Sequence, residues 1–540
     1  MNPASTDMSA VDPFTVEVIR NALNAAAEEM SAIVMRSARS PLLREAGDLS
    51  STIMDADGAL IAQGHDVPVH LGVLSYTVKS FLERIPKERL KPGDIWFFNL
   101  PEVGGNHLPD VKAVRPVFYD GRIIAFATSL AHWADIGGAA PGSYYANATD
   151  AWMEGLRISP LRVVAGDEID AEKLEIILSN VRGRREREGD LLAQVAATRI
   201  ADRRIAEIVQ RHGIETFEAT IAKLHDLSDK QMRAVLRSLP DGVFEGVDYL
   251  DDGGPSDQPV AIRVKITKTN DTAIFDFSDS DDAIAGPLNT TPYVAGSAVF
   301  YCIRALAREI IQPNGGAYRP LQIITRAGSV FDPGAGKPVV GGNHETSQRA
   351  VDAIFKALEP HAGEKISAGG NTSSGLVIFS GPTPDGGWAT LYEPHGGGEG
   401  ARADRDGRPV VRVHLTNVMN TPVEVIEAEY AIRVEHQKLR VGSGGVGAHR
   451  GGDGMSRAYR MLSDGITATT MFERRVVPPY GLRGGADGFP ARVTLQPGDS
   501  AAVKLRGKQN IALAKGDLVI VETPGGGGYG VPFAGAQERV

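Results

Sequence analysis

Cysteine is nearly absent from this chain, which has a single cysteine among 540 residues, Cys302 in the apolar run AVFYCIRAL. One thiol cannot form an internal disulfide, which agrees with a protein of the reducing cytoplasm. Its apolar surroundings favour a small buried core residue over a nucleophile. The first residues, MNPASTDMSAVDP, lack the basic start and apolar core of a signal peptide, so we expect a cytoplasmic location.

Long apolar runs and basic stripes are missing as well. No run approaches the roughly 18 apolar residues that a membrane span needs, so we predict no membrane partner. The net charge is -10, and acidic and basic residues are mixed along the chain. Without a basic face or stripe, nucleic acid is excluded as an expected partner.

Several common catalytic motifs do not occur. A phosphate loop of the form GxxxxGK[ST] is not found, because Pro338 follows Gly336 and Lys337 where a hydroxyl residue is required. No GxSxG elbow marks a nucleophilic serine. The zinc motifs HExxH and CxxC are absent too, so any metal site must be built from scattered residues.

Glycine, in contrast, is abundant, with 62 residues, many of them in clusters between aliphatic segments. Such clusters predict tight turns and close approaches of the backbone. The C-terminal ETPGGGGYG, from Glu522 to Gly530, is interpreted as a tight turn that permits close packing. An anion cradle made of backbone N–H groups is the alternative.

Hydrophobic periodicity predicts an α+β fold with several lobes. Asp12 can cap and Pro13 can open a long first helix. A hairpin turn is predicted at residues 56–58, and further helices at 294–308 and 347–358. We expect an N-terminal metal-binding lobe of helices and strands at 1–165, a charged helical arm at 166–240, a central α+β lobe with a strand pair from Val243 at 241–423, and a glycine-rich, β-rich C-terminal lobe at 424–540.

Histidines and carboxylates offer the best chemistry. GGNHLPD places His107 and Asp110 three residues apart, His132 follows the strand-like RIIAFATSL, and Glu45 lies in LLREAGDLSS. Two imidazoles and two carboxylates suit zinc, manganese or iron(II). Four His-x-x-acid matches occur among 12 histidines and 67 acids, whereas random placement gives about 1.5. Spacing alone therefore leaves open a set of ordinary polar loop residues.

At these same residues the sequence resembles the hydantoinase B family. The family includes subunits of N-methylhydantoinase, 5-oxoprolinase and caprolactamase, and a subunit of the acetone and acetophenone carboxylases. The resemblance extends from about Val11 to Pro532 and rests on an ordered series of motifs: REAGDLSS, PVHLG, GGNHLPD, AHWADIGG, GGNHETSQR, HLTNVMNTPVEV, SGGVGAHRGGDG, PPYGLRGG and ETPGGGGYG.

The resemblance implies a divalent metal ion, held by Glu45, His107, Asp110 and His132. It further implies a partner subunit, a hydantoinase A-like ATPase, that uses ATP to phosphorylate a cyclic amide. A metal-bound water would then attack the activated intermediate. A heterotetramer or larger assembly is also implied. Leu100 and Trp133 differ from the residues that many family members have there, so we expect them to affect substrate specificity.

Other polar residues are weaker candidates. Asp48 and Asp135 can orient ligand imidazoles or hold a proton, and His70 in PVHLG is a candidate general base. The alternative for His70 is a structural role. Further polar groups are Asn343, His344 and Glu345 before a predicted helix, and His395, Glu399 and Arg402, which could meet an anionic group.

The sequence thus predicts the metal-binding beta subunit of a two-component, ATP-dependent amidohydrolase that opens a hydantoin, lactam or similar cyclic amide. The first alternative is the equivalent subunit of an ATP-dependent ketone carboxylase. The second is a scaffold that has lost its metal and only organises the ATPase partner.

Overall fold

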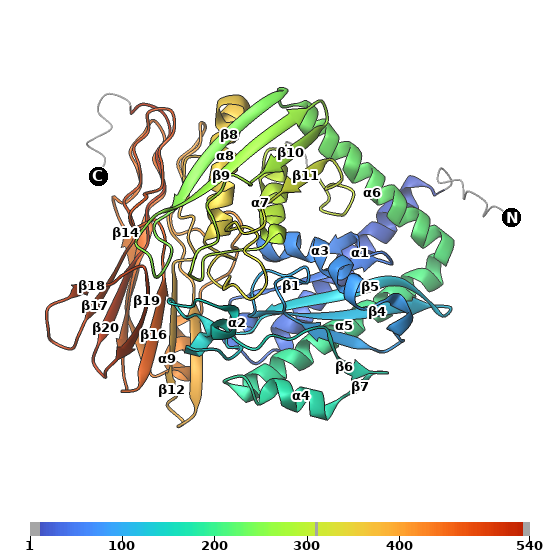
Figure 1. The fold of residues 1–540 in the computed structure, drawn as a ribbon, viewed down its shortest axis with the longest axis horizontal. Helices are drawn as coiled ribbons and strands as arrows, with labels where there is room; N and C mark the ends of the chain where they lie inside the picture. The colour runs from blue at the N-terminus through green and yellow to red at the C-terminus, as the bar shows by residue number, and fades with distance from the viewer. Residues whose placement is uncertain (1–10, 308–310, 533–540) are drawn as a thin grey trace.

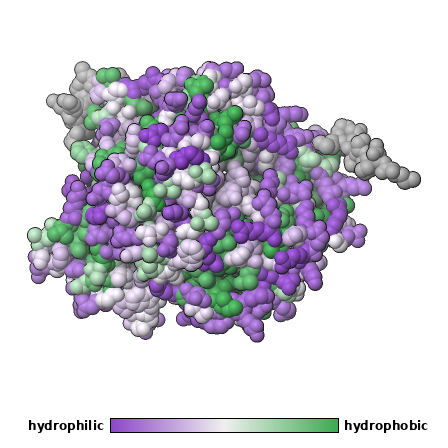
Figure 2. Space-filling view, in the orientation of Figure 1, coloured by the Kyte–Doolittle hydropathy of each residue, from purple (hydrophilic) through white to green (hydrophobic). Residues whose placement is uncertain are grey.

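The computed structural model describes residues 11–307 and 311–532. Within them, helices and strands mix in an α+β fold with four β-sheets, as predicted (Figure 1). None of the described helices combines the length and the apolar character needed to cross a membrane. On the face shown in Figure 2, hydrophilic residues cover most of the surface and apolar residues form separate patches.

The first sheet is antiparallel and has the strand order β2-β1-β5-β4-β3-β6-β7. Because successive strand residues point to opposite faces, Ile53 packs with the first helices while Met54 faces the other side. The predicted turn at residues 56–58 connects β1 to β2, with Gly58 at φ 81°. The strands are β1 (Leu49–Asp55), β2 (Leu60–Gln63), β3 (Ile95–Phe98), β4 (Asp110–Tyr119), β5 (Arg122–His132), β6 (Leu161–Ala165) and β7 (Glu168–Ile169).

Helices cover both faces of this sheet. Helix α1 (Pro13–Ser37) begins as predicted, with the Asp12 side chain accepting a hydrogen bond of 3.0 Å from Thr15 N. It packs with α5 (Arg184–His212) on one face, and α3 (Pro68–Arg84) covers the other. The remaining helices of this half are α2 (Pro41–Arg44), α4 (Ala171–Leu178) and α6 (Ile214–Arg237), with short 3-10 turns at Lys87–Arg89, Pro141–Ser143 and Ala151–Glu154.

The predicted helical region is confirmed around α5 and α6. Helix α5 packs directly on the first sheet, where it lies against α1, β4 and β5 (Figure 1). Leu191, Val195 and Ile205 on α5 are buried in the same core as the sheet. Most charged residues of α5 and α6 lie outside this core, as the helical spacing requires, but Arg187 and Asp190 of α5 are buried as an ion pair.

A second sheet, in the order β11-β10-β9-β8, occupies the centre of the sequence. The strand pair predicted from Val243 becomes three antiparallel strands, and β11 joins them in parallel. Helix α8 lies across β8 and β9 (Figure 1). The elements are β8 (Gly242–Leu250), β9 (Val260–Thr269), β10 (Thr272–Asp276), α7 (Pro292–Ala305), β11 (Leu321–Ile324), α8 (Thr346–Ala362) and a 3-10 turn at Gly363–Lys365. Cys302 is buried in α7, as expected.

Two further sheets, ordered β13-β12-β16-β19 and β14-β15-β20-β17-β18, make the C-terminal part β-rich (Figure 1). Their apolar residues form one shared core. The glycine clusters of this part pack backbone against backbone. A Cβ at Gly526 would lie 2.0 Å from the Glu399 carbonyl oxygen, so a larger residue would collide there. The elements are β12 (Leu376–Pro382), β13 (Trp388–Glu393), α9 (Val423–Glu429), β14 (Ile432–Arg440), β15 (Gly454–Met461), β16 (Ile466–Met471), β17 (Arg492–Gln496), β18 (Val503–Lys504), β19 (Lys508–Leu513) and β20 (Leu518–Glu522).

Candidate metal centre

Three neighbouring strands of the first sheet bring a set of potential metal ligands together. Asp110 is the first residue of β4 and His132 is the last residue of β5, and the two are directly opposite in the antiparallel register. Asp48 immediately precedes β1, and its carbonyl oxygen accepts a 3.0 Å hydrogen bond from His132 N. Strand register therefore places two carboxylates and an imidazole at one edge of the sheet.

His107 completes the cluster from the loop between β3 and β4. Its Nε2 lies 2.9 Å from Asp110 Oδ1, and its Nδ1 lies 3.0 Å from the Val340 carbonyl oxygen. His132 Nδ1 lies 2.9 Å from the same Asp110 oxygen. One ligand atom from each of His107, Asp110 and His132 lies within 4.8 Å of the others, and all three side chains are buried.

These residues fit a divalent metal. His132 Nε2 is buried with no hydrogen-bond partner among the described residues, and such an orphaned nitrogen is a natural ligand atom. Burial lowers the pKa of His107 to about 4 although Asp110 acts in the opposite direction, so its imidazole is neutral. Burial alone would raise the pKa of Asp110, but His107 and His70 hold it well below its usual range. Metal binding needs both of these protonation states.

His70 and Asp48, predicted as supporting residues, both lie at this cluster. His70 comes from α3, with Nε2 3.2 Å from Asp110 Oδ2 and 3.7 Å from Asp48 Oδ1. Its Nδ1 lies 3.3 Å from Ser50 Oγ. Burial lowers the pKa of His70, but Asp110 and Asp48 outweigh it, so the net direction is upward. Asp48 Oδ2 also lies 3.9 Å from His132 Nδ1.

Glu45 and Asp135 are not part of this cluster. Glu45 caps the C-terminus of α2, and its Oε1 lies 2.8 Å from Arg44 Nε in a partly exposed pair. Asp135 organises the turn after β5, where its two oxygens accept 2.7 Å hydrogen bonds from Gly137 N and Gly142 N. The second carboxylate at the cluster is that of Asp48, because Asp48 directly precedes β1, which starts at Leu49, and its carbonyl oxygen is bonded to His132 N.

Asn106 and Lys112 also contact Asp110, and the sequence analysis missed both. Asn106 donates a hydrogen bond to Asp110 Oδ2 and another, of 3.0 Å, to Asn343 Oδ1. Lys112 Nζ donates to Asn106 Oδ1 at 3.2 Å and to the Asp110 carbonyl at 3.0 Å. Burial lowers the pKa of Lys112 to about 8. Their positions in the sequence could have indicated these contacts, because Asn106 directly precedes His107 and Lys112 lies on the same strand face as Asp110.

Aromatic hydroxyls close the other side of the cluster. The Tyr144 hydroxyl lies 3.1 Å from His344 Nε2, 3.2 Å from the Tyr392 hydroxyl and 3.5 Å from His107 Nδ1. Burial raises the pKa of Tyr144 well above its usual range, so the hydroxyl keeps its proton. No motif marks Tyr144 or Tyr392 in the sequence, since they come from a loop and from β13.

His344 and Glu345, named as weaker candidates, form the outer end of this chain of contacts. His344 Nδ1 lies 3.0 Å from Glu345 Oε1, which also accepts a 2.9 Å hydrogen bond from Ser374 N. Burial lowers the pKa of His344 to about 3 and raises that of Glu345 to about 7. Leu100 and Trp133, expected to affect specificity, are buried in the two cores of the first sheet.

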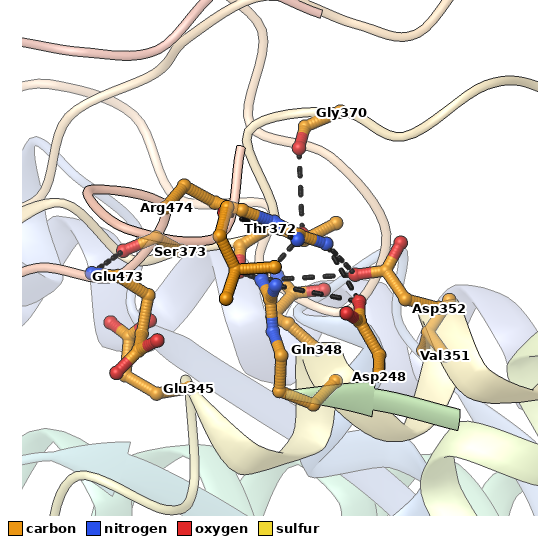
Figure 3. Close-up of polar contacts among 12 residues, drawn as sticks. Asp248, Glu345, Gln348, Val351, Asp352, Gly370, Thr372, Ser373, Glu473 and Arg474 are labelled. Carbon is orange, nitrogen blue, oxygen red and sulfur yellow. Dashed lines mark hydrogen bonds and ion pairs between the residues drawn. The ribbon is translucent and has the colours of Figure 1, made fainter. Parts of the chain in front are cut away.

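A buried ion cluster fixes the loop beside Glu345 (Figure 3). Arg474 Nη2 lies 2.8 Å from Asp248 Oδ2 and 2.7 Å from Asp352 Oδ2, so it joins β8 to α8. Its Nε donates a 2.9 Å hydrogen bond to Thr372 Oγ1, and Arg349 donates to the same residue. Through Thr372 the ions hold the 370–374 loop, whose Ser374 contacts Glu345.

Comparison with known proteins identifies the family. The family model described as Hydantoinase B/oxoprolinase matches residues 12–532. An uncharacterised protein of Methanocaldococcus jannaschii is 36% identical over 525 residues, which cover 97% of this chain and 91% of that protein. The crystal structure of the ATP-dependent caprolactamase from Pseudomonas jessenii matches with a TM-score of 0.92 and 28% identity, covering 96% of this chain and 91% of that one.

The chain belongs to the hydantoinase B/oxoprolinase family. The 5-oxoprolinase of Saccharomyces cerevisiae is 32% identical over 553 residues. The match covers 96% of this chain but 42% of that protein, so the chain corresponds to less than half of the 5-oxoprolinase.

Proposed function

We propose that the chain is the metal-binding subunit of a two-component, ATP-dependent amidohydrolase that opens a cyclic amide such as a hydantoin or a lactam. The observation that carries the proposal is the buried cluster of His107, Asp110 and His132 in a chain of this family. The similarity to a caprolactamase subunit beta and its structure supports a lactam-like substrate. The ATPase partner supplies the phosphorylated amide, since this chain has no phosphate loop.

His107, Asp110 and His132, with Asp48 as the second carboxylate, would hold zinc, manganese or iron(II). When bound, such an ion polarises a carbonyl oxygen and lowers the pKa of water, which is the chemistry that amide hydrolysis needs. Asn106 and Lys112 orient Asp110 by hydrogen bonds. Glu45 has no place in this proposed ligand set because its carboxylate is paired with Arg44.

In this proposal His70 is the general base, and Tyr144 donates a hydrogen bond to the oxyanion of the reaction. His70 Nε2 lies 3.2 Å from Asp110 Oδ2, within reach of the centre, and α3 holds its ring. The Tyr144 hydroxyl can donate to an oxyanion beside His107 because burial keeps it protonated. Asp135 acts at a distance, by fixing the turn that follows His132.

The first prediction concerns metal content. Purified chain is expected to carry about one divalent ion by elemental analysis, and His107→Ala is expected to lose it because a neutral imidazole ligand is removed. His212→Ala is the matched control, since His212 has the same His-x-x-acid spacing but ends α5, away from the sheet edge. Equal metal content in wild type and His107→Ala would contradict the site.

The second prediction tests the reaction itself. Co-expressed with a hydantoinase A-like ATPase, the chain is expected to open hydantoins or lactams only when ATP, both subunits and the metal are present. Product formation and ATP consumption are measured together, and native mass spectrometry tests for a heterotetramer or larger assembly. Turnover by this chain alone would overturn the two-subunit proposal. A requirement for bicarbonate and a ketone would replace it with the carboxylase alternative.

A further inference from the structure

Arg412 is a partly buried arginine in the segment between β13 and α9. Its Nη1 donates to the Ser374 carbonyl and its Nη2 lies 3.5 Å from Ser374 Oγ, while its Nε is buried without a hydrogen-bond partner among the described residues. In the same described ranges, no carboxylate lies within 4.0 Å of its guanidinium. The fully buried arginines Arg187, Arg349, Arg457 and Arg474 each have such a carboxylate. The partly buried Arg304 and Arg475 resemble Arg412, because their Nε atoms are also buried without a hydrogen-bond partner among the described residues.

The charge of Arg412 is therefore poorly compensated. Burial lowers its pKa, even though Tyr392, Asp48 and Glu345 in its surroundings act in the opposite direction. An enclosed cation without a contacting anion is costly in free energy, and such a position is normally completed by a partner. Arginine presents a planar fork of donors that fits phosphate and carboxylate groups.

Arg412 lines a cavity of about 240 Å³. Arg402 and Arg408 also line it, so three arginines face a single carboxylate, that of Glu399. Glu399 contacts Arg408 at 2.8 Å and Arg402 at 3.7 Å, which leaves Arg412 outside the ion pairs. His414 adds no charge, because burial lowers its pKa to about 4. We call this cavity the arginine pocket.

The arginine pocket and the metal centre are connected by short contacts. Arg412 binds the carbonyl of Ser374, and Ser374 N donates to Glu345 at 2.9 Å. From Glu345, contacts of 3.0 and 3.1 Å lead through His344 to the Tyr144 hydroxyl beside His107. The ion cluster of Figure 3 holds the 370–374 loop in place on this path. Gly370 of that loop lines the pocket itself.

We propose that the arginine pocket binds the phosphoryl group of the activated cyclic amide, with Arg412 as the enclosed contact and Arg402 and Arg408 at the exposed end. The inference rests on the proposed function, because the partner ATPase must supply the phosphorylated substrate. Arg408 has 72% of its side chain exposed and Arg402 has 39%, so an anion meets them first. Arg412 then holds the anion where the contact path through Ser374 and Glu345 to the metal centre begins.

The test is a titration of metal-loaded chain with inorganic phosphate, followed by calorimetry, with acetate as the carboxylate probe. Wild type is expected to bind phosphate in a one-to-one ratio and acetate much more weakly. Arg412→Met is expected to weaken phosphate binding by at least about 30-fold while retaining the metal, since a buried charge contact is lost. Arg405→Met is the matched control, because Arg405 is exposed nearby and does not line the pocket.

Unchanged phosphate affinity in Arg412→Met overturns the proposal, as does tighter binding of acetate than of phosphate by wild type. If Arg412→Met fails to retain its metal, phosphate binding is measured with Arg402→Gln instead. An unchanged phosphate affinity in Arg402→Gln then overturns the proposal. With the ATPase partner present, Arg412→Met is expected to lower kcat/KM for the cyclic amide, and an unchanged value overturns the assignment to the intermediate. Wild type that binds phosphate but opens no cyclic amide contradicts the proposed function and leaves the anion site standing.

Discussion

Asp110→Asn is expected to abolish metal retention and to lower the rate of cyclic-amide opening by about 10²–10³-fold or more. The substitution keeps the shape of the side chain and removes its negative charge. Asp110 Oδ1 lies 2.9 Å from both His107 Nε2 and His132 Nδ1, and Oδ2 lies 3.2 Å from His70 Nε2. No other carboxylate in the described residues contacts all three of these imidazoles within 4.0 Å.

The size of the effect follows from the central position of this carboxylate. Residues that only orient metal ligands already change metal affinity by about 10–100-fold when they are mutated. A carboxylate that is itself a proposed ligand, and that contacts both His107 and His132, is expected to matter more. In wild type Asn106 donates a hydrogen bond to Asp110 Oδ2. An asparagine at position 110 can place its own amide donor there, so that two donors would meet and the two side chains would have to rearrange.

Elemental analysis and single-turnover assays with the ATPase partner measure the two effects separately. Asp120→Asn is the matched control: Asp120 is exposed in the turn between β4 and β5, at the far end of the strand pair that carries Asp110 and His132. Its positive φ of 48° suits asparagine as well as aspartate. Full metal content with normal turnover in Asp110→Asn would remove Asp110 from the centre.

Local signals in the sequence were sufficient for much of the fold. The start of α1 depends on Asp12 and Pro13, which act within one helical turn, so the sequence alone predicts it. The helical spacing of α5 and α6 and the turn at Gly58 are equally local. The sheet order and the parallel pairing of β11 depend on contacts between distant segments, and periodicity carries no information about them.

In the candidate site, too, some residues could be predicted from local sequence and others could not. His107, Asp110 and His132 stood out because motifs of a known family surround them. The position of Asp48 beside the cluster could not be predicted, because it depends on where β1 enters the sheet and pairs with β5. Tyr144 reaches the cluster from a loop and Tyr392 from the distant strand β13, and no spacing in the sequence relates them to His107.

Arg474→Met is expected to lower the free energy of unfolding by about 3–5 kcal/mol. Arg474 is fully buried between Asp248 and Asp352, at 2.8 and 2.7 Å. Methionine fills a similar volume but removes the cation that bridges the two carboxylates most closely, and leaves them the longer contacts of Arg349, 3.5 Å from Asp248 and 3.7 Å from Asp352. Because the cluster joins β8, α8 and the 370–374 loop, the change is expected to loosen the wall of the metal centre as well (Figure 3).

The pH dependence of this effect has a definite sign. Burial would raise the pKa of Asp248, but Arg474 and Arg349 lower it below its usual value. Its contribution to stability is therefore complete above the unfolded pKa of about 3.9 and is lost as the pH falls through the lower folded pKa. Urea unfolding followed by tryptophan fluorescence at pH 7 should show the full loss in Arg474→Met, and the difference from wild type should shrink in strong acid.

Arg184→Met provides the comparison, because Arg184 forms an exposed pair with Glu175, in which both side chains are more than half exposed. Water and salt screen such a pair, so its loss is expected to leave the urea midpoint almost unchanged. If Arg474→Met behaves like Arg184→Met, the buried ions do not stabilise the fold, and the loop that holds Ser374 beside Glu345 and Arg412 must be positioned by the packing of the neighbouring glycine segments instead.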